Sequence, residues 1–343
     1  MSALDDLKMI HDRDAQDALG IAEKQWRQLQ ENYNLPKIEG HFSNIVYAGM
    51  GGSSLSAWLA QTWPGISLPY EICRTYNIPK YVDEKTLFIC CSFSGSTEET
   101  LSALAEAEAK NARIVVITSG GKLEEVARAK SYPLAKLPEI SQPRYASLAI
   151  LKALVEVLIA AGLQDVSKKV ELEELAKQLE PQLKLYRADV PTDQNPAKQL
   201  ALELAGSTPV VYASTLLGGV AYKWKISLNE NAKNVAWYGI YPEFNHNEFL
   251  GWSSHPVDKP YKIINLISSF DHPQIKKRFE VSERMLSGKK PAAHNVDLRG
   301  ETLLQQMIYG TTFGDFVSLY LALLNGLNPS PVDLIQKLKA ELV

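Results

Sequence analysis

Two loops rich in glycine and hydroxyl residues are the segments of the sequence best suited to hold a ligand. Residues 49–54 read Gly-Met-Gly-Gly-Ser-Ser, and residues 92–100 read Ser-Phe-Ser-Gly-Ser-Thr-Glu-Glu-Thr. Glycines let backbone N–H groups approach an anion at the start of a helix, where the helix dipole favours negative charge. In the second loop, Ser92, Ser94 and Thr97 are spaced so that their O–H groups can converge on one tetrahedral anion. Together the two loops predict a phosphate site.

Other interpretations of these loops compete with phosphate binding. A dinucleotide fingerprint needs glycine where Ser54 stands, and a P-loop needs a lysine before the hydroxyl residue, which is absent. A nucleotide-binding protein would also use an acid on the next strand to bind the ribose, and Glu71 lies near that place, so this alternative stays open. Thr97 could simply cap the following helix, but capping accounts for one hydroxyl and not for four.

Three further segments carry side chains that could move protons or stabilise charge. Glu230 stands in Asn-Glu-Asn-Ala-Lys at a predicted helix end, and a carboxylate in a water-poor pocket can act as a base. His246 stands in Asn-His-Asn-Glu and can shuttle a proton near neutral pH. Arg144 follows Pro143 before a long helix, and its guanidinium can stabilise developing negative charge. Each also has an ordinary interpretation, namely a solvated helix-end carboxylate, a structural histidine and a surface charge.

A repeated strand–loop–helix unit in the first half of the chain must position the two loops. Short apolar runs without polar alternation predict buried parallel strands at Asn44–Ala48, Thr86–Cys91 and Arg113–Thr118. Helical spacing of apolar residues predicts helices at residues 54–61 and 98–109, close after the two loops. This alternation predicts an α/β fold with a doubly wound, mostly parallel sheet flanked by helices.

The second half repeats this pattern after a helical connection. Further elements are predicted as helices at residues 145–161, 164–187, 216–228 and 302–324, and as strands at residues 209–213 and 262–268. The end of the charged segment 281–291, Ser-Gly-Lys-Lys-Pro, is predicted to be a surface loop. We therefore predict an N-terminal domain at residues 1–160, a helical connection at 161–195 and a C-terminal domain at 196–343.

The last predicted helix, residues 332–342, is amphipathic. Its apolar side chains recur at helical spacing and predict a buried face made of Val332, Ile335, Leu338 and Leu342. Its lysines would ordinarily be solvated.

Composition favours small-molecule chemistry. The 343 residues are 45% hydrophobic and 22% charged, and the net charge of −3 with scattered basic residues gives no footprint for nucleic acid or an anionic membrane. The N-terminus is polar and no run approaches about 18 apolar residues, which predicts a cytoplasmic protein without a membrane span. Three cysteines make no disulfide framework and the histidines show no ligand spacing, so no metal and no cofactor are predicted.

These segments together resemble the bifunctional phosphoglucose/phosphomannose isomerase family. Gly-Met-Gly-Gly-Ser followed by Ser-x-Ser-Gly-x-Thr-x-Glu-Thr is similar to the signature of sugar-isomerase (SIS) domains. Pro-Arg, Asn-Glu-Asn-Ala-Lys and Asn-His-Asn-Glu resemble the family's other segments in the expected order, so the resemblance spans about residues 44–342. The sequence departs from the family at Ser54, Phe93 and Tyr145. The resemblance implies two flavodoxin-like SIS domains with the active site at their junction.

The resemblance also implies a role for particular residues. It assigns the substrate phosphate to a set of glycine and hydroxyl residues, namely Gly52, Ser53, Ser92, Ser94 and Thr97. It implies that Glu230 is the base, that Arg144 faces the reacting end of the sugar and that His246 opens the sugar ring.

Two positions near the C-terminus complete the implied site. Lys339 aligns with an active-site lysine that assists ring opening, although Lys337 competes for the same role. Ser330, in a Ser-Pro pair, stands where the family has a threonine whose hydroxyl makes room for both C2 epimers.

The implied activity is a metal-independent aldose–ketose isomerisation. Glucose 6-phosphate, and also mannose 6-phosphate because Ser330 keeps the hydroxyl of the family's threonine, would convert to fructose 6-phosphate through a cis-enediol(ate). The resemblance implies a homodimer in which His246 is contributed across the interface. Two rivals remain: another SIS sugar-phosphate isomerase, and a non-catalytic SIS module that senses a phosphosugar and regulates a partner.

Overall fold

Two compact units make up the computed structural model, which describes residues 2–254 and 259–342. The N-terminal sheet unit is Gln25–Glu180, and the C-terminal sheet unit combines Met1–Lys24 with Pro181–Val343. Each unit has its own parallel β-sheet. The chain therefore has the two parallel-sheet α/β halves that the sequence predicts.

The sheet of the N-terminal unit has five parallel strands in the order β2-β1-β3-β4-β5. The strands are β1 (Asn44–Ala48), β2 (Tyr70–Cys73), β3 (Thr86–Cys91), β4 (Arg113–Thr118) and β5 (Leu134–Lys136). All six residues of β3 are buried, as expected for a central strand covered on both faces. The order is that of flavodoxin-like folds, and the three predicted strands of this half are confirmed with their bounds.

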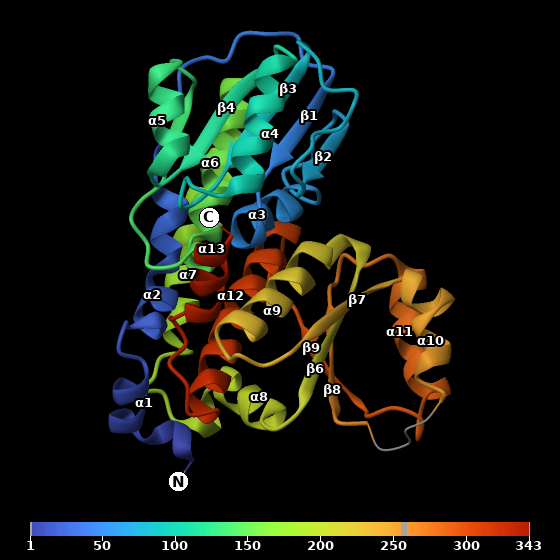
Figure 1. The fold of residues 1–343 in the computed structure, drawn as a ribbon. Helices are drawn as coiled ribbons and strands as arrows, with labels where there is room; N and C mark the ends of the chain where they lie inside the picture. The colour runs from blue at the N-terminus through green and yellow to red at the C-terminus, as the bar shows by residue number, and fades with distance from the viewer. Residues whose placement is uncertain (1, 255–258, 343) are drawn as a thin grey trace. The chain divides into compact units, whose positions relative to one another are not determined.

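Helices cover both faces of this sheet. They are α3 (Gly51–Ala60), α4 (Glu98–Ala109), α5 (Gly121–Ala129) and α6 (Ser147–Ala160), and the next helix along the chain is α7 (Ser167–Lys184). In Figure 1, α4 and α5 lie over one face of the sheet, whereas α3 and α6 pack against each other on the opposite face. The helices α3 and α4 begin at the carboxyl ends of β1 and β3, where the two glycine- and hydroxyl-rich loops lie.

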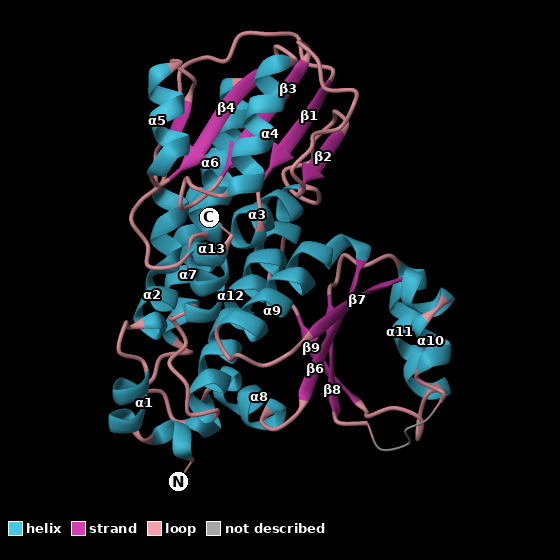
Figure 2. Cartoon of the chain, viewed as in Figure 1, coloured by secondary structure: helices cyan, strands magenta, loops and turns pink. Residues whose placement is uncertain are grey.

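The sheet of the C-terminal unit has four parallel strands in the order β7-β6-β8-β9. The strands are β6 (Thr208–Ser214), β7 (Trp237–Tyr241), β8 (Tyr261–Ile267) and β9 (Ala293–Asp297). Figure 2 shows α8 (Pro196–Leu204), α9 (Gly218–Glu230) and α12 (Leu303–Leu324) on one side of this sheet, with α10 (Glu248–Gly251) and α11 (Pro273–Met285) on the other. No counterpart of β5 follows β9 here, because the chain passes from β9 directly into α12.

The helix α12 is the core helix of its unit. It is long and apolar enough to cross a membrane by length and composition, with a mean hydropathy of 1.3 over its most apolar window. However, 94% of that window is buried inside the protein, which is how a helix at the centre of a globular core behaves.

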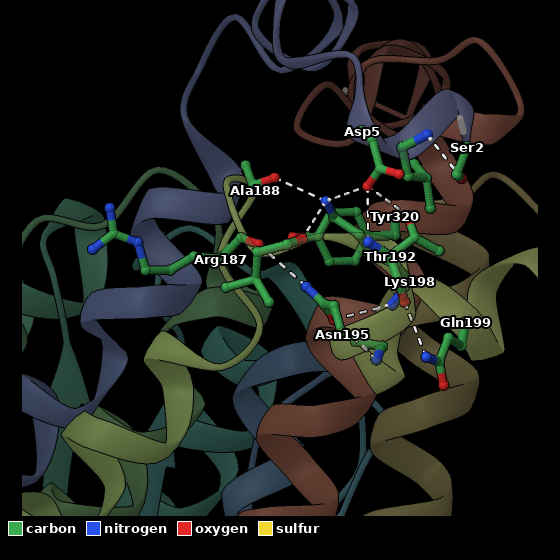
Figure 3. Close-up of polar contacts among 12 residues, drawn as sticks. Ser2, Asp5, Arg187, Ala188, Thr192, Asn195, Lys198, Gln199 and Tyr320 are labelled. Atoms are coloured by element: carbon green, nitrogen blue, oxygen red, sulfur yellow. Dashed lines mark hydrogen bonds and ion pairs between the residues drawn. The ribbon is translucent and has the colours of Figure 1, made fainter.

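Polar contacts fix the N-terminal segment, which includes α1 (Leu7–Arg13) and α2 (Ala18–Lys24), within the C-terminal sheet unit (Figure 3). Asp5 accepts hydrogen bonds from the backbone N and the Oγ1 of Thr192, both at 2.8 Å. The buried Lys198 Nζ donates to the carbonyls of Ala188 and Val190, each at 2.8 Å, and lies 3.6 Å from the Asp5 carboxylate. Burial lowers the pKa of Lys198, although the nearby Asp5 opposes this shift.

The predicted domain boundaries at residues 160 and 195 stay a prediction. By contacts, Met1–Lys24 belongs with the second sheet and not with the strands that follow it in sequence. Ion pairs and hydrogen bonds to distant residues hold this N-terminal segment in place. Such contacts produce no periodic pattern in the local sequence, so the sequence could not predict this placement.

The C-terminal helix α13 (Asp333–Glu341) forms where it is predicted, but the prediction that its apolar face is buried is wrong. No residue of α13 is buried, and Leu338 and Leu342 are 59% and 66% exposed. Apolar residues at helical spacing indicate a face that is able to pack, and they do not show that the same chain supplies a surface to cover it.

Candidate active site

The first loop opens α3 without a side-chain cap. Gly51 has a positive φ of 50°, a conformation that favours glycine, and Met50 at the N-cap position has no side-chain oxygen to offer to the first-turn N–H groups. Ser53 N donates to the Met50 carbonyl at 2.9 Å, but the N–H groups of Gly51 and Gly52 precede the hydrogen-bond ladder of the helix and have no acceptor within it. Gly52 is required by close packing, because a Cβ there would lie 3.0 Å from the backbone N of Arg144.

The second loop brings two of its hydroxyls together. Ser92 Oγ and Thr97 Oγ1 lie 2.8 Å apart, and Ser92 Oγ also accepts a hydrogen bond from Gly95 N at 3.1 Å. Thr97 occupies the N-cap position of α4, yet its side chain makes no capping hydrogen bond. The capping interpretation of Thr97 is therefore not what the structure shows. Ser94 is exposed in the same loop, where its Oγ accepts from Ser96 N at 3.4 Å.

The two loops are in direct contact. Phe93 N donates a hydrogen bond to Ser53 Oγ at 3.0 Å, and both Ser53 and Ser92 are buried. The central strand β1 lies between β2 and β3, so the loops after β1 and β3 meet at the point where the strand order reverses. Open α/β sheets bind ligands in the crevice beyond the carboxyl ends of their strands at this point.

Arg144 joins this cluster as a buried cation. Only 1% of Arg144 is exposed, so the surface-charge interpretation is wrong. Its guanidinium lies 4.7 Å from the centre of the Tyr145 ring, and its Nη1 donates to Gln142 Oε1 at 3.3 Å. The departure from the family pattern at Tyr145 thus supplies an aromatic support for the guanidinium. Within one unit, the structure brings the backbone of Arg144 against Gly52 and the first loop against the second.

Glu230 is the last residue of α9, and its neighbours in the Asn-Glu-Asn-Ala-Lys segment hold the helix end in place. Asn229 Nδ2 donates to the carbonyls of Lys225 and Ala236, at 2.8 and 3.1 Å. Asn231 is fully buried and donates from Nδ2 to Ser318 Oγ on α12 at 2.9 Å. The amides of the motif are therefore scaffolding, and Glu230 itself is half-buried between them.

A buried ion pair lies in the same interface between α9 and α12. Lys223 Nζ is 2.6 Å from Asp315 Oδ1, both side chains are at most 2% exposed, and Ser227 Oγ donates to the same oxygen at 2.9 Å. Lys223, Ser227 and Asn231 recur every four residues and so share one face of α9. Sequence reasoning missed this network, although Asp315, the single charged residue of the apolar helix α12, was a signal that could have found it.

His246 ends a short 3-10 helix, Glu243–His246, that follows β7, and its side chain is exposed. Asn245 is fixed by Ser282 Oγ and by Arg278 Nη1, at 2.8 and 3.1 Å. Asn247 Nδ2 donates to Glu243 Oε1 at 2.8 Å. As in the Glu230 segment, the flanking amides hold the loop while the candidate catalytic side chain projects from it.

The two candidate positions near the C-terminus also belong to the C-terminal sheet unit. Ser330 is 3% exposed and precedes α13, and its N donates to Asn328 Oδ1 at 3.1 Å. Lys337 and Lys339 are both exposed on α13, so the structure does not choose between them. Across residues 2–254 and 259–342, no three His, Cys, Asp or Glu side chains gather as metal ligands. All three cysteines are free and buried, and burial raises the pKa of Cys91 to about 12.

Comparison with known proteins agrees with this architecture. Residues 43–163 match the model of the SIS domain, and residues 193–342 match that of the bacterial phospho-glucose isomerase C-terminal SIS domain. A glucose-6-phosphate isomerase like protein from Thermus thermophilus superposes with a TM-score of 0.67 at 18% identity, covering 98% of this chain and 99% of that one. The fold and the paired loops define a two-domain SIS protein.

Closer relatives identify the family. Bifunctional phosphoglucose/phosphomannose isomerases from Caldicellulosiruptor bescii and Aquifex aeolicus are 34% and 33% identical, over 87% and 88% of this chain and 89% and 91% of theirs. The chain belongs to the bifunctional phosphoglucose/phosphomannose isomerase family. A D-glucosamine-6-phosphate 4-epimerase from Sulfolobus acidocaldarius is also 33% identical, over 67% of this chain and 72% of that protein.

Proposed function

We propose that the protein interconverts glucose 6-phosphate, and also mannose 6-phosphate, with fructose 6-phosphate through a cis-enediol(ate) and without a metal. One observation carries the proposal: the buried Arg144 packs against Gly52 at the switch point of the N-terminal sheet, where the strand order reverses between β1 and β3. The two helices that begin there, α3 and α4, lack side-chain caps. N–H and O–H donors are there for a phosphate, and a permanent cation is there for negative charge. Family membership supplies the reaction class.

Each step is assigned to a residue of this chain. Gly52, Ser53, Ser92, Ser94 and Thr97 bind the phosphate. His246 moves the proton that opens the sugar ring, with Lys339 assisting. Glu230 then takes the proton from one carbon of the C1–C2 pair and returns it to the other, while Arg144 stabilises the enediolate oxygen. The phosphate holds the sugar, so the two carbons meet one base in one orientation.

Removal of the Glu230 carboxylate tests this assignment. A coupled assay would follow fructose 6-phosphate formed from each sugar with EDTA present, in wild type, Glu230→Gln and the exposed Glu280→Gln as a matched control. We expect kcat to fall at least about a thousandfold in Glu230→Gln, because the only proton-transfer base is lost, and to stay within about twofold in Glu280→Gln.

Other outcomes would replace the proposal. Wild type that binds a phosphosugar without turnover would be a sensor module. A product inverted at C4, seen by NMR, would instead place the chain with its epimerase relative.

We further propose a cytoplasmic homodimer in which His246 completes the site of the second copy, in a reaction that serves glycolysis and gluconeogenesis. His246 is exposed, as is Leu250 four residues later at 74%, which supports such an interface, and three free cysteines support the compartment.

Subunit mixing tests the shared site. Glu230→Gln and His246→Ala are expected to be inactive alone. In a mixed dimer one site receives both substitutions and the other receives neither, so about a quarter of wild-type activity should return for random pairing. Lack of recovery in a verified mixed dimer would show that each chain uses its own His246.

A further inference from the structure

Lys233, the last residue of the Asn-Glu-Asn-Ala-Lys segment, has a contact pattern that the proposed reaction does not use. Its backbone has a positive φ of 49°, a conformation in which lysine is strained and glycine or asparagine is favoured. Its Nζ lies within hydrogen-bond distance of three backbone carbonyls, those of Asn231, Asn328 and Pro329, at 3.3, 2.9 and 2.8 Å. Strained residues persist where the surrounding contacts hold them, and here the contacts are those of the ammonium group.

The three carbonyls belong to two segments that are far apart in sequence. Asn231 follows Glu230 directly, whereas Asn328 and Pro329 directly precede Ser330. Asn325 Nδ2 adds a second bond between the same segments, because it donates to the Ala232 carbonyl at 3.1 Å. An ammonium group has three donors and no acceptor, so it can hold several carbonyls at once.

Asn328 connects Lys233 to Ser330. The Asn328 carbonyl accepts from Lys233, and its side-chain Oδ1 accepts from Ser330 N at 3.1 Å. Ser330 is 3% exposed, so its hydroxyl has little freedom once the backbone before it is fixed. A shift of Asn328 would therefore move the Ser330 hydroxyl relative to the Glu230 segment.

We propose that Lys233 is a positioning residue that fixes the Ser330 hydroxyl relative to the base and thereby sets the tolerance for both C2 epimers. This inference rests on the proposed isomerase function and on the role in epimer tolerance that the family resemblance implies for Ser330. Without the ammonium group, the 328–330 segment loses two of the hydrogen bonds that connect it to the base segment. Mannose phosphate turnover should then suffer more than glucose phosphate turnover.

Kinetics of the full chain test the proposal. Lys233→Met removes the charge and leaves the same backbone strain, Lys233→Arg keeps a cation with several donors, and Lys262→Met on β8 is an exposed control. We expect the ratio of kcat/KM for mannose 6-phosphate to that for glucose 6-phosphate to fall about fivefold or more in Lys233→Met, since a misplaced hydroxyl changes discrimination. Lys233→Arg and Lys262→Met should stay within about twofold of wild type.

Two further measurements separate positioning from general damage. In a Ser330→Ala background, Lys233→Met should change the ratio no further, because the hydroxyl that Lys233 positions is gone. Amide hydrogen exchange should rise about tenfold at Asn328, Ser330 and Val332 in Lys233→Met, and not at β1 or β3. If Lys233→Met does not fold, Lys233→Gln takes its place with the same expected directions.

The outcomes distinguish this inference from the proposed function. Wild type that turns over both sugars, together with an unchanged ratio in Lys233→Met, would overturn the role of Lys233 alone. The role of Lys233 would also be overturned if Lys233→Met lowered the ratio equally in the wild-type and the Ser330→Ala backgrounds. Wild type that turns over neither sugar would overturn the proposed function and, with it, any role in epimer choice.

Discussion

Both sheet units have a point where the strand order reverses, but the two points differ in whether their hydrogen-bond donors are already bound by the chain. In the N-terminal unit β1 lies between β2 and β3, and in the C-terminal unit β6 lies between β7 and β8, so each sheet reverses its strand order at its first strand. After β1 and β3 come loops whose hydroxyls contact one another and whose helices lack side-chain caps. After β8, the corresponding loop donors are bound by the chain itself.

Asp271 and Gln306 are the residues that occupy the second switch point. Ser268 N donates to Asp271 Oδ2 at 2.9 Å, and Ser269 N donates to Gln306 Oε1 at 3.2 Å. Ser268 Oγ donates to the same glutamine oxygen at 2.6 Å, and both Asp271 and Gln306 are buried. A built-in carboxylate takes the donors that an external anion would need and also repels it. A doubly wound topology therefore creates a place for an anion, and side chains decide whether that place is available.

The largest expected difference between the two units is in the loss of kcat/KM when matched glycines at the start of α3 and α9 are replaced by alanine. A Cβ at Gly52 would meet the Arg144 backbone at 3.0 Å, whereas a Cβ at Gly218 would meet only Ile240 Cδ1 at an ordinary 3.6 Å. We expect Gly52→Ala to lower kcat/KM about a hundredfold, because the phosphate loop and Arg144 must separate. Gly218→Ala should remain within about threefold. Equal losses in the two variants, measured with glucose 6-phosphate, would mean that both helix starts matter alike.

A smaller difference is expected from paired serines. Ser92 faces the Thr97 hydroxyl, whereas Ser214 is buried at the end of β6 beside the Asp271 carboxyl. Ser92→Ala should raise KM about tenfold, since a hydroxyl bonded to a charged group contributes about 1.5–3 kcal/mol. Ser214→Ala should leave KM unchanged, because this serine lies beside a built-in carboxyl, which leaves no place for a substrate phosphate. Initial-rate kinetics of both variants make the comparison, and a raised KM in Ser214→Ala would contradict it.

Sequence reasoning predicted the first switch point better than the second. The strands β1, β3 and β4 are continuous apolar runs, and their bounds are confirmed. The edge strands β2 and β5 were missed, because they are short and only partly buried and so lack such a run. The loop hydroxyls that approach one another, Ser92 and Thr97, could be predicted because they lie five residues apart on one turn of chain.

The features that sequence could not supply depend on long-range partners. Lys223 and Asp315 are 92 positions apart by number, and nothing local to either residue specifies the other. Gln306 reaches the loop after β8 from α12, 38 residues away from Ser268. The exposed face of α13 shows the same limit in reverse, since its pattern predicts a partner that the chain does not provide. Local periodicity determines which faces can be buried, and only the tertiary arrangement determines what covers them.

The smallest expected effect is on the pH dependence of stability, and it tests whether Asp271 is a buried charge. Burial raises the pKa of Asp271, and hydrogen bonds at the loop oppose this only in part. A carboxyl group whose pKa is higher in the folded state stabilises the fold below its unfolded pKa of about 3.9, and this stabilisation is lost as the pH rises through the folded value.

Asp271→Asn removes this titration while keeping an oxygen that can accept from Ser268 N. Relative to wild type, the variant should therefore gain free energy of unfolding as the pH rises above about 3.9, where the wild-type carboxyl ionises at a cost. Urea unfolding of both proteins at a series of pH values measures the difference, in which the other carboxyl groups cancel. A difference that does not change with pH would mean that Asp271 is as well solvated as a surface carboxylate, and the second switch point would then be open enough for an anion after all.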